Sequence, residues 1–155
     1  EGYLVPSSKL HLQLGAIIEQ CQYIEAIKWR YDLAPQKTMF RAPDQYGYLT
    51  ASLQPTKKLS LSFSGTYTGS MLVQHYAGYI PRDIEVSTKS FFDLTIKLMY
   101  DLAINNLTKL QLNLGAQNLF NSYQNDFDKG INRDAAYIYG PALPRTVFAG
   151  IKIML

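Results

Sequence analysis

The sequence predicts an all-β protein, an antiparallel transmembrane β-barrel segment of about six long strands. Three observations lead to this prediction: apolar residues recur at every second position, short turns alternate with long loops, and the polar positions of the strands are small and mostly uncharged. The chain has 155 residues, of which 47% are hydrophobic, 17% charged and 13% aromatic, with 12 tyrosines. Such a composition does not fit a disordered segment.

The first two predicted strands cover residues 10–18 and 47–54. In the first, Leu10, Leu12 and Leu14 alternate with polar residues such as His11. In the second, apolar residues at positions 49, 51 and 53 alternate with tyrosine, threonine and serine. Alternation of this kind places one apolar and one polar face on a strand, and a helix cannot use it.

Four further strands follow with the same period. Residues 59–73 carry leucine, phenylalanine, glycine, tyrosine, methionine or valine at odd positions and serine or threonine at nearly all even ones. Residues 92–104, 109–117 and 147–155 repeat the alternation, with lysine, aspartate, glutamine and asparagine among the polar positions. These runs are longer than the average strand of roughly 5–6 residues, so six long amphipathic strands are expected.

The connections alternate in length. Residues 55–58 and 105–108 read as tight turns because they contain proline, asparagine and lysine, whereas residues 31–43, 77–88 and 124–144 form long links. Short turns on one edge and long loops on the other are typical of an outer-membrane barrel, in which the short turns are periplasmic. The last strand then runs toward the periplasm, and the C-terminus is expected on that side.

The polar face and the aromatic residues favour a membrane over a soluble sandwich. A tilted strand of about 9–11 residues crosses a bilayer, and serine, threonine, glutamine, asparagine and glycine suit a wet inner wall. Aromatic residues gather where strands approach the long links, at Tyr46, Tyr48, Tyr67, Tyr76, Tyr79, Phe91, Phe92, Phe120 and Tyr123. Tyrosine suits the boundary between lipid and water because its ring is apolar and its tip polar.

Several classes of function are excluded. The net charge of +3 is spread along the chain, which argues against nucleic acid, and the single Cys21 cannot form an internal disulfide. No serine elbow, phosphate loop or HExxH helix occurs, so we expect no enzyme, catalytic residue, cofactor or metal site. Asp126 and Asp128 imitate the start of a calcium loop, but Tyr137 stands at its twelfth position. Turn chemistry is the favoured interpretation and calcium the alternative.

The C-terminal third resembles a known family. Residues 115–121 read GAQNLFN, residues 123–130 read YQNDFDKG, residues 133–141 read RDAAYIYGP, and PRT and GIKI follow at 144–146 and 150–153. Together these segments look like the end of a TonB-dependent outer-membrane receptor of the kind found in Bacteroidetes. Residues 67–71 and 91–94 are similar to the preceding strands of the same barrels.

The resemblance implies an incomplete assembly. These receptors enclose an N-terminal plug in a barrel of roughly 22 strands, so residues 1–155 are expected to form the C-terminal part of the barrel, with the plug absent. The implied partners are outer-membrane lipid, the remainder of the barrel and plug, and the TonB complex, which acts through the missing plug. The two unpaired edges would leave the segment either to associate with its own copies or to curl into a small barrel.

By the same resemblance, the function is uptake of a scarce, bulky small-molecule nutrient: a ferric siderophore first, cobalamin or haem next. The three long links would form the extracellular vestibule. Aromatic and guanidinium groups suit flat chelates and anions, and the candidate ligand-binding residues are Tyr76, Tyr79, Arg82, Arg133, Tyr137 and Tyr139. A passive porin-like channel and a soluble lipocalin-type β-barrel that binds a small ligand remain the alternatives.

Overall fold

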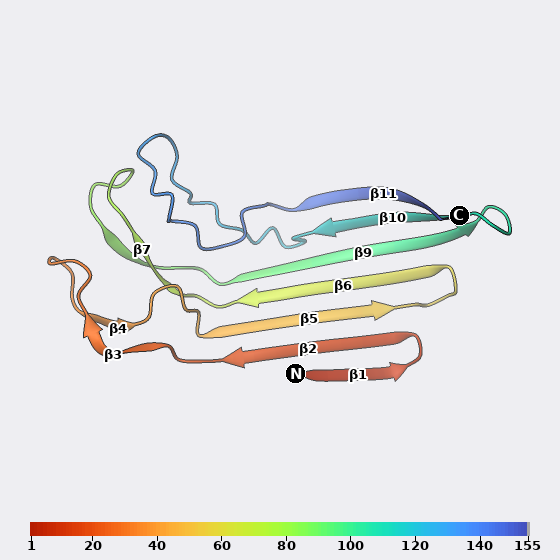
Figure 1. Cartoon of the computed structure of the whole chain (residues 1–155), viewed down its shortest axis with the longest axis horizontal. Helices are drawn as coiled ribbons and strands as arrows, with labels where there is room; N and C mark the ends of the chain where they lie inside the picture. The colour runs from red at the N-terminus through yellow and green to blue at the C-terminus, as the bar shows by residue number, and fades with distance from the viewer. Residues whose placement is uncertain (155) are drawn as a thin grey trace.

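The computed structural model describes residues 1–154, except for the side chains of Pro6 and Ser7. Leu155, the last residue of the strand predicted over residues 147–155, lies outside the described residues. Seven of its strands form one antiparallel sheet in the order β1-β2-β5-β6-β9-β10-β11 (Figure 1). Their bounds are β1 (Gly2–Ser7), β2 (Leu10–Ile18), β5 (Gln45–Leu53), β6 (Leu59–Thr68), β9 (Phe91–Ala103), β10 (Lys109–Gln117) and β11 (Thr146–Met154). The all-β antiparallel prediction is confirmed.

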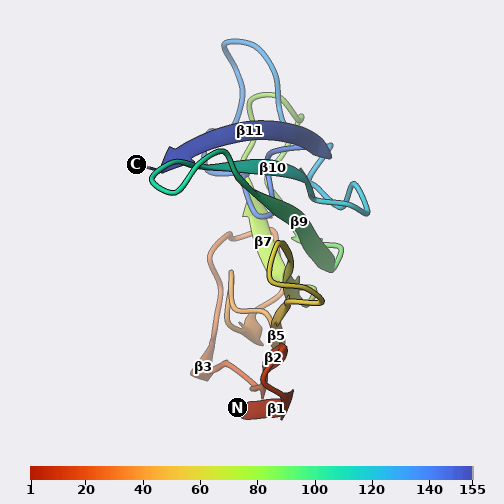
Figure 2. The same ribbon diagram turned by 90° about the vertical axis from the view of Figure 1, so that its right-hand side faces the viewer.

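The sheet is open. Its outer strands, β1 and β11, lie at opposite edges, and the layer twists and curves between them, as Figure 2 shows in the view along the strands. Right-handed strand twist accumulates across neighbouring strands and produces this curvature. The chain therefore does not curl into a small closed barrel, and each outer strand keeps one unpaired backbone edge.

The register aligns the apolar positions of all seven strands. One row crosses the sheet through Leu4, Leu12, Ala51, Phe63, Ile96, Ala116 and Val147. A neighbouring row on the other side of the sheet contains Gln13, Thr50, Ser64 and Thr95. We call these two sides the apolar face and the polar face. Because directly opposed residues point to the same side of a sheet, the two faces stay separate along every strand.

Most predicted strands agree with the structure within a few residues, and β2 and β10 have the predicted bounds. Two differences have physical causes. β6 ends at Thr68, not at residue 73, because its neighbours β5 and β9 begin at Gln45 and Phe91 and offer no partner further on. After Gly69, whose N–H still donates to the Gln45 carbonyl at 2.8 Å, the chain enters a separate hairpin. β1 was not predicted; it contains a proline, and its pairing with β2 shifts register between Leu4 and Ser7.

The long connections all lie at one end of the strands, and the short turns and Met154 lie at the opposite end (Figure 1). Two of the long connections contain hairpins: β3 (Gln22–Ile27) pairs with β4 (Gln36–Thr38), and β7 (Leu72–His75) pairs with β8 (Ile84–Ser87). The third, residues 118–145, contains no strand. No helix among residues 1–154 is long and apolar enough to cross a membrane.

The buried residues lie beside the long connections rather than between two sheets. Val73, Phe91 and Tyr137 are the buried hydrophobic residues of the described chain, with exposures of 0%, 5% and 4%. On the apolar face, by contrast, Val147 and Ile151 are each 70% exposed. A single-layer sheet cannot bury its own apolar face, so this face requires an external apolar environment.

Gly115 of β10 provides a test of this packing. A Cβ at Gly115 would lie 2.6 Å from the Ile96 carbonyl oxygen and would also meet the Phe148 ring, whereas a Cβ at Gly150 of β11 would meet nothing within 4 Å. We expect Gly115→Ala to lower the free energy of unfolding by about 1–3 kcal/mol, because backbone must move. Gly150→Ala, the matched control, should change it by less than about 0.5 kcal/mol. Urea unfolding in detergent micelles measures both, and equal effects would contradict the register of β9, β10 and β11.

Candidate functional site

The candidate site is the loop cluster, which we define as the three long connections, residues 19–44, 69–90 and 118–145. Arg41 joins all three. Its backbone N–H donates to the Leu72 carbonyl at 2.8 Å, and its guanidinium donates to the carbonyls of Ala136 and Ile138 at 2.5 and 3.1 Å. Because one guanidinium presents several donors in a fixed fork, it can hold two carbonyls of the same segment.

Trp29 and Arg30 attach the first connection to the second. The Trp29 indole N–H donates to Glu85 at 2.8 Å, and its ring meets the edge of Tyr76 at 5.5 Å between centroids. The Arg30 guanidinium lies 2.9 Å from a carboxylate oxygen of Asp83, whose other oxygen accepts the Ala77 N–H. The two hairpins are thus joined by polar groups that lie far apart in the sequence.

His75 and Asp128 attach the second connection to the third. The His75 Nε2 lies 2.9 and 3.0 Å from the two carboxylate oxygens of Asp128, and their side chains are only 7% and 2% exposed. The His75 ring also stacks on Tyr137, with centroids 3.6 Å apart and planes 6° apart. Asp134 extends this contact, since one of its oxygens accepts the Tyr76 N–H at 2.9 Å. The stack and the hydrogen bonds fix the end of β7 against residues 128–137.

Gln124 organises the third connection from inside. It is 1% exposed, its side-chain oxygen accepts the N–H groups of Tyr139 and Gly140 at 2.9 and 3.3 Å, and its amide donates to the Tyr137 carbonyl at 3.1 Å. A buried amide satisfied at both ends replaces the backbone partners that this segment lacks. Residues 139–141, the YGP segment, therefore take a defined path without any regular secondary structure.

The Asp126 carboxylate accepts hydrogen bonds from two tyrosine hydroxyls. Tyr137 donates to it at 3.0 Å, and Tyr139 lies 2.7 and 2.8 Å from its two oxygens. Burial alone would raise the pKa of Asp126, but the hydrogen bonds from Tyr139, Tyr137 and Gln124 outweigh it and hold this pKa below its ordinary 3.8. Burial and the bond to Asp126 raise the pKa of Tyr137 to about 12, and the same causes raise the pKa of Tyr139.

The base of the third connection is closed by the asparagines of the NLFN segment. Asn118 is 3% exposed and has a φ of 48°, and Asn121 has a φ of 56°, a region that asparagine tolerates better than most residues. The Asn118 amide donates to the carbonyls of Ser122 and Leu143 at 3.2 and 2.9 Å, and its oxygen accepts the Ser122 N–H. Asn118 thereby ties the two ends of this connection together.

The six residues that the sequence selected as ligand-binding candidates fall into two groups. Tyr76 and Tyr79 are 41% and 54% exposed, and Arg82 and Arg133 are also exposed. Tyr137 is buried and Tyr139 half-buried, and both phenols are committed to Asp126. A Cβ at Gly78 would lie 2.6 Å from the Asn132 oxygen, so the tips of the second and third connections, which carry the exposed candidates, lie together.

In the second and third connections, the carboxylates and the cationic side chains differ in the contacts that they make. All five carboxylates there accept hydrogen bonds within the chain, namely Asp83, Glu85, Asp126, Asp128 and Asp134. The exposed side chains of Arg82, Lys129 and Arg133, in contrast, make no ion pair with any described residue. Among the exposed charged side chains of these two connections, the cations therefore outnumber the carboxylates: Arg82, Lys89, Lys129, Arg133 and Arg145 are exposed, against Asp126 alone.

Sequence reasoning missed several residues that build this site, among them Trp29, Arg41, His75 as a loop contact, and Gln124. Two of them carried a weak signal: Trp29 is the single tryptophan of the chain, and Gln124 is a polar residue at the start of a predicted link. For metals, no group of three His, Cys, Asp or Glu residues among residues 1–154 is placed to hold an ion. Asp126 and Asp128 face different partners, the two phenols and His75.

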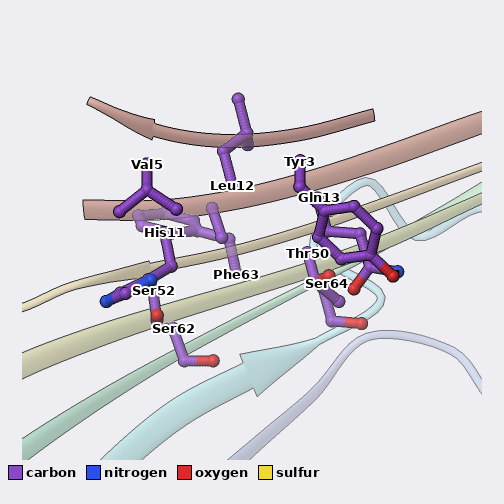
Figure 3. Close-up of a pocket in the computed structure, with 11 residues that line it drawn as sticks. Tyr3, Val5, His11, Leu12, Gln13, Thr50, Ser52, Ser62, Phe63 and Ser64 are labelled. Atoms are coloured by element: carbon purple, nitrogen blue, oxygen red, sulfur yellow. The ribbon is translucent and has the colours of Figure 1, made fainter. Parts of the chain in front are cut away.

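The polar face carries a second feature, a cavity of about 370 Å³ over β1, β2, β5 and β6. Figure 3 shows its wall, which combines apolar and aromatic residues, Tyr3, Val5, Leu12 and Phe63, with the polar residues His11, Gln13, Thr50, Ser52, Ser62 and Ser64. Serine faces serine and threonine faces serine across β5 and β6. Hydroxyls that donate and accept without charge form a wettable wall, which suits the inside of a barrel.

The phenols of the third connection make its stability depend on pH. Because the folded chain raises the pKa of Tyr137 to about 12 from an ordinary 10, the associated stability is present below pH 10 and is lost as the pH rises toward 12. We expect the urea midpoint to fall over that interval, and to fall less in Asp126→Asn, which removes the carboxylate. Tyr79→Phe, at an exposed phenol, is the control and should behave as the parent chain. A midpoint that stays constant would contradict the burial of Tyr137.

No protein-family model matches the chain, and no curated protein matches it. Among solved structures, the chain is similar to the ferric-catecholate import receptor Fiu of E. coli K12 in its closed form, with a TM-score of 0.63 and 22% identity. The likeness covers 96% of this chain and 19% of the receptor chain, so the chain spans about a fifth of that protein's length. At this identity the likeness shows the fold: the open antiparallel sheet is that of part of a β-barrel receptor.

Proposed function

We propose that the chain forms part of the barrel wall of a TonB-dependent receptor in a bacterial outer membrane, and that this receptor imports an anionic iron chelate. The observation that carries the proposal is the alignment of 96% of the chain with part of a ferric-catecholate import receptor. The separate apolar and polar faces support it, because a barrel wall needs one face for lipid and one for the lumen. The Bacteroidetes-like motifs belong to the same proposal.

In this proposal the apolar face contacts lipid. Leu114, Val147 and Ile151 are 53%, 70% and 70% exposed on that face, and a bilayer supplies the apolar surroundings that a single sheet lacks. The short turns and the C-terminal strand end then lie in the periplasm and the loop cluster outside the cell. Strands β1 and β11 would pair with the remainder of the barrel, whose plug would contact TonB.

The loop cluster would form part of the vestibule that binds the chelate. Its accessible cations, Arg82, Lys129 and Arg133, suit an anionic ligand, and the exposed rings of Tyr76 and Tyr79 offer flat apolar surface. Tyr137 and Tyr139 would act differently, by holding the third connection through Asp126. A catecholate chelate of iron is anionic and aromatic, as these groups favour. Haem shares both properties, so the likeness to a ferric-catecholate receptor is the reason to put the catecholate first.

A matched pair of substitutions tests the membrane assignment. Leu61 lies on the apolar face and Ser62 on the polar face of the same strand. We expect Leu61→Lys to lower the free energy of unfolding in lipid vesicles by about 2–4 kcal/mol, because it places a charge in the hydrocarbon, and Ser62→Lys by less than about 1 kcal/mol. Urea unfolding of the whole receptor in vesicles measures both. A larger effect at Ser62 would reverse the faces, and recovery of the protein without detergent would refute the membrane proposal.

Charge reversal tests the ligand proposal. We expect Arg82→Glu and Arg133→Glu each to weaken binding of a ferric catecholate by about tenfold or more, since each loses a charge-assisted contact and adds repulsion. Lys57→Glu, at the exposed short turn on the opposite edge of the sheet, makes the same charge change away from the vestibule and should leave binding unchanged. Equilibrium binding of radiolabelled iron chelate to the whole receptor measures all three. Equal weakening by Lys57→Glu would mean that only net charge matters.

A further inference from the structure

Side-chain oxygen atoms of three residues converge in the third connection. The Tyr139 hydroxyl lies 2.8 and 2.7 Å from the Oδ1 and Oδ2 atoms of Asp126, and the Tyr137 hydroxyl lies 3.0 Å from the same Oδ2 atom. The two tyrosine rings are neighbours, with centroids 5.2 Å apart. We call the Asp126 carboxylate and the two hydroxyls the oxygen cluster. Two of its donors are phenols, so it differs from the usual His, Cys, Asp and Glu sets that bind metals.

The two rings are held by contacts that do not involve their hydroxyls. Gln124 donates to the Tyr137 carbonyl at 3.1 Å and accepts the Tyr139 N–H at 2.9 Å. The His75 ring stacks on the Tyr137 ring with centroids 3.6 Å apart. These contacts do not depend on the phenol protons, so the rings keep their places if those protons are replaced. The oxygen cluster is therefore preorganised, which lowers the free-energy cost of binding an ion at it.

The charge of the oxygen cluster is exposed. Asp126 is the exposed carboxylate of the second and third connections, and it forms no ion pair with any described residue. Asp83 and Asp128, by contrast, are buried beside Arg30 and His75. An accessible negative charge that no cation of the described chain neutralises is open to a cation from solution.

The chemistry of the oxygen cluster selects among cations. Neighbouring ligands of an octahedral ion with metal–oxygen bonds of about 2.0 Å lie about 2.8 Å apart, whereas calcium, with bonds of about 2.3–2.6 Å, needs wider spacing. Burial and the bonds to Asp126 raise the pKa of Tyr137 and Tyr139, so only a strong Lewis acid displaces both phenol protons. One carboxylate and two phenolates balance the charge of a trivalent ion, and tyrosine oxygen also ligates iron in haem proteins.

We propose that Asp126, Tyr137 and Tyr139 bind a ferric ion directly, through the carboxylate and two phenolates, with water or a small oxygen chelator in the remaining positions. Binding releases the two phenol protons to water and leaves the oxidation state of the iron unchanged. The proposal goes beyond the proposed function, which concerns recognition of an intact chelate by exposed side chains. Such a site accepts iron from chelators that leave coordination positions open.

Titration of the whole receptor, purified in detergent, with ferric nitrilotriacetate tests the site, because this chelator leaves coordination positions of the iron open. We expect a single ferric ion per receptor, a visible phenolate-to-iron charge-transfer absorption, and tyrosinate ring vibrations in the resonance Raman spectrum. Tyr139→Phe should weaken iron binding by about a hundredfold or more, since loss of a ligand costs at least as much as loss of an outer-shell partner. Excess calcium should not displace the iron.

Tyr31→Phe is the matched control, because it removes an 82% exposed phenol from the first connection, and it should keep the parental affinity and spectrum. Asp126→Glu keeps a carboxylate and should retain more of the absorption than Asp126→Asn. No charge-transfer absorption in the parent, an unchanged absorption in Tyr139→Phe, or an equal loss in Tyr31→Phe would each overturn the proposal.

The parental resonance Raman spectrum requires no substitution, so absence of tyrosinate vibrations overturns the proposal even where a variant fails to fold. Iron that binds without phenolate absorption is an adventitious ion only, which also overturns it. Heat-modified gel mobility shows whether each variant is folded. Binding of an intact, coordinatively saturated catecholate chelate and membrane fractionation report separately on the proposed function, so failure of the ferric site leaves that function standing.

Discussion

The register of the seven-stranded sheet is the constraint on which the rest of the structure depends. Side chains alternate with a period of two, so a slip of one residue between any two strands would move apolar side chains such as Phe63 onto the polar face. The uninterrupted pairing of β5, β6, β9, β10 and β11 prevents this. Because neighbouring strands in the sheet run antiparallel, short turns and long connections alternate along the chain, and all long connections lie at the same end of the strands.

The loop cluster combines the buried side chains of Val73 and Tyr137 with polar contacts that join its three connections. His75 with Asp128, Gln124 with the YGP segment, and Arg41 with two carbonyls each join segments that the sheet alone would leave apart. Gln124, which is 1% exposed, is partnered at both its oxygen and its amide nitrogen, as buried polar groups must be. Such a network gives the loops a defined shape before any ligand binds. The ligand then does not lose binding free energy to the ordering of the loops.

The sequence was sufficient for the long strands because their period of two persists over nine or more residues. It was insufficient for β1, where a proline and a register shift interrupt the period, and for β7 and β8, which have four residues each. For the candidate site, residue type alone selected Tyr76, Tyr79, Tyr137 and Tyr139 together. What separates them is three-dimensional: Trp29 meets Glu85 across 56 positions and His75 meets Asp128 across 53, and no local pattern reveals such contacts.

The loop cluster and the polar face of the sheet differ in how many of their buried hydrogen-bond acceptors have a donor. In the second and third connections every carboxylate has a donor within the chain, and the exposed charged side chains there are cations apart from Asp126. On the polar face of the sheet, Asp93 and Asn113 keep buried acceptors without donors. In the proposed function, the loop cluster is therefore the part of this chain that would face the ligand.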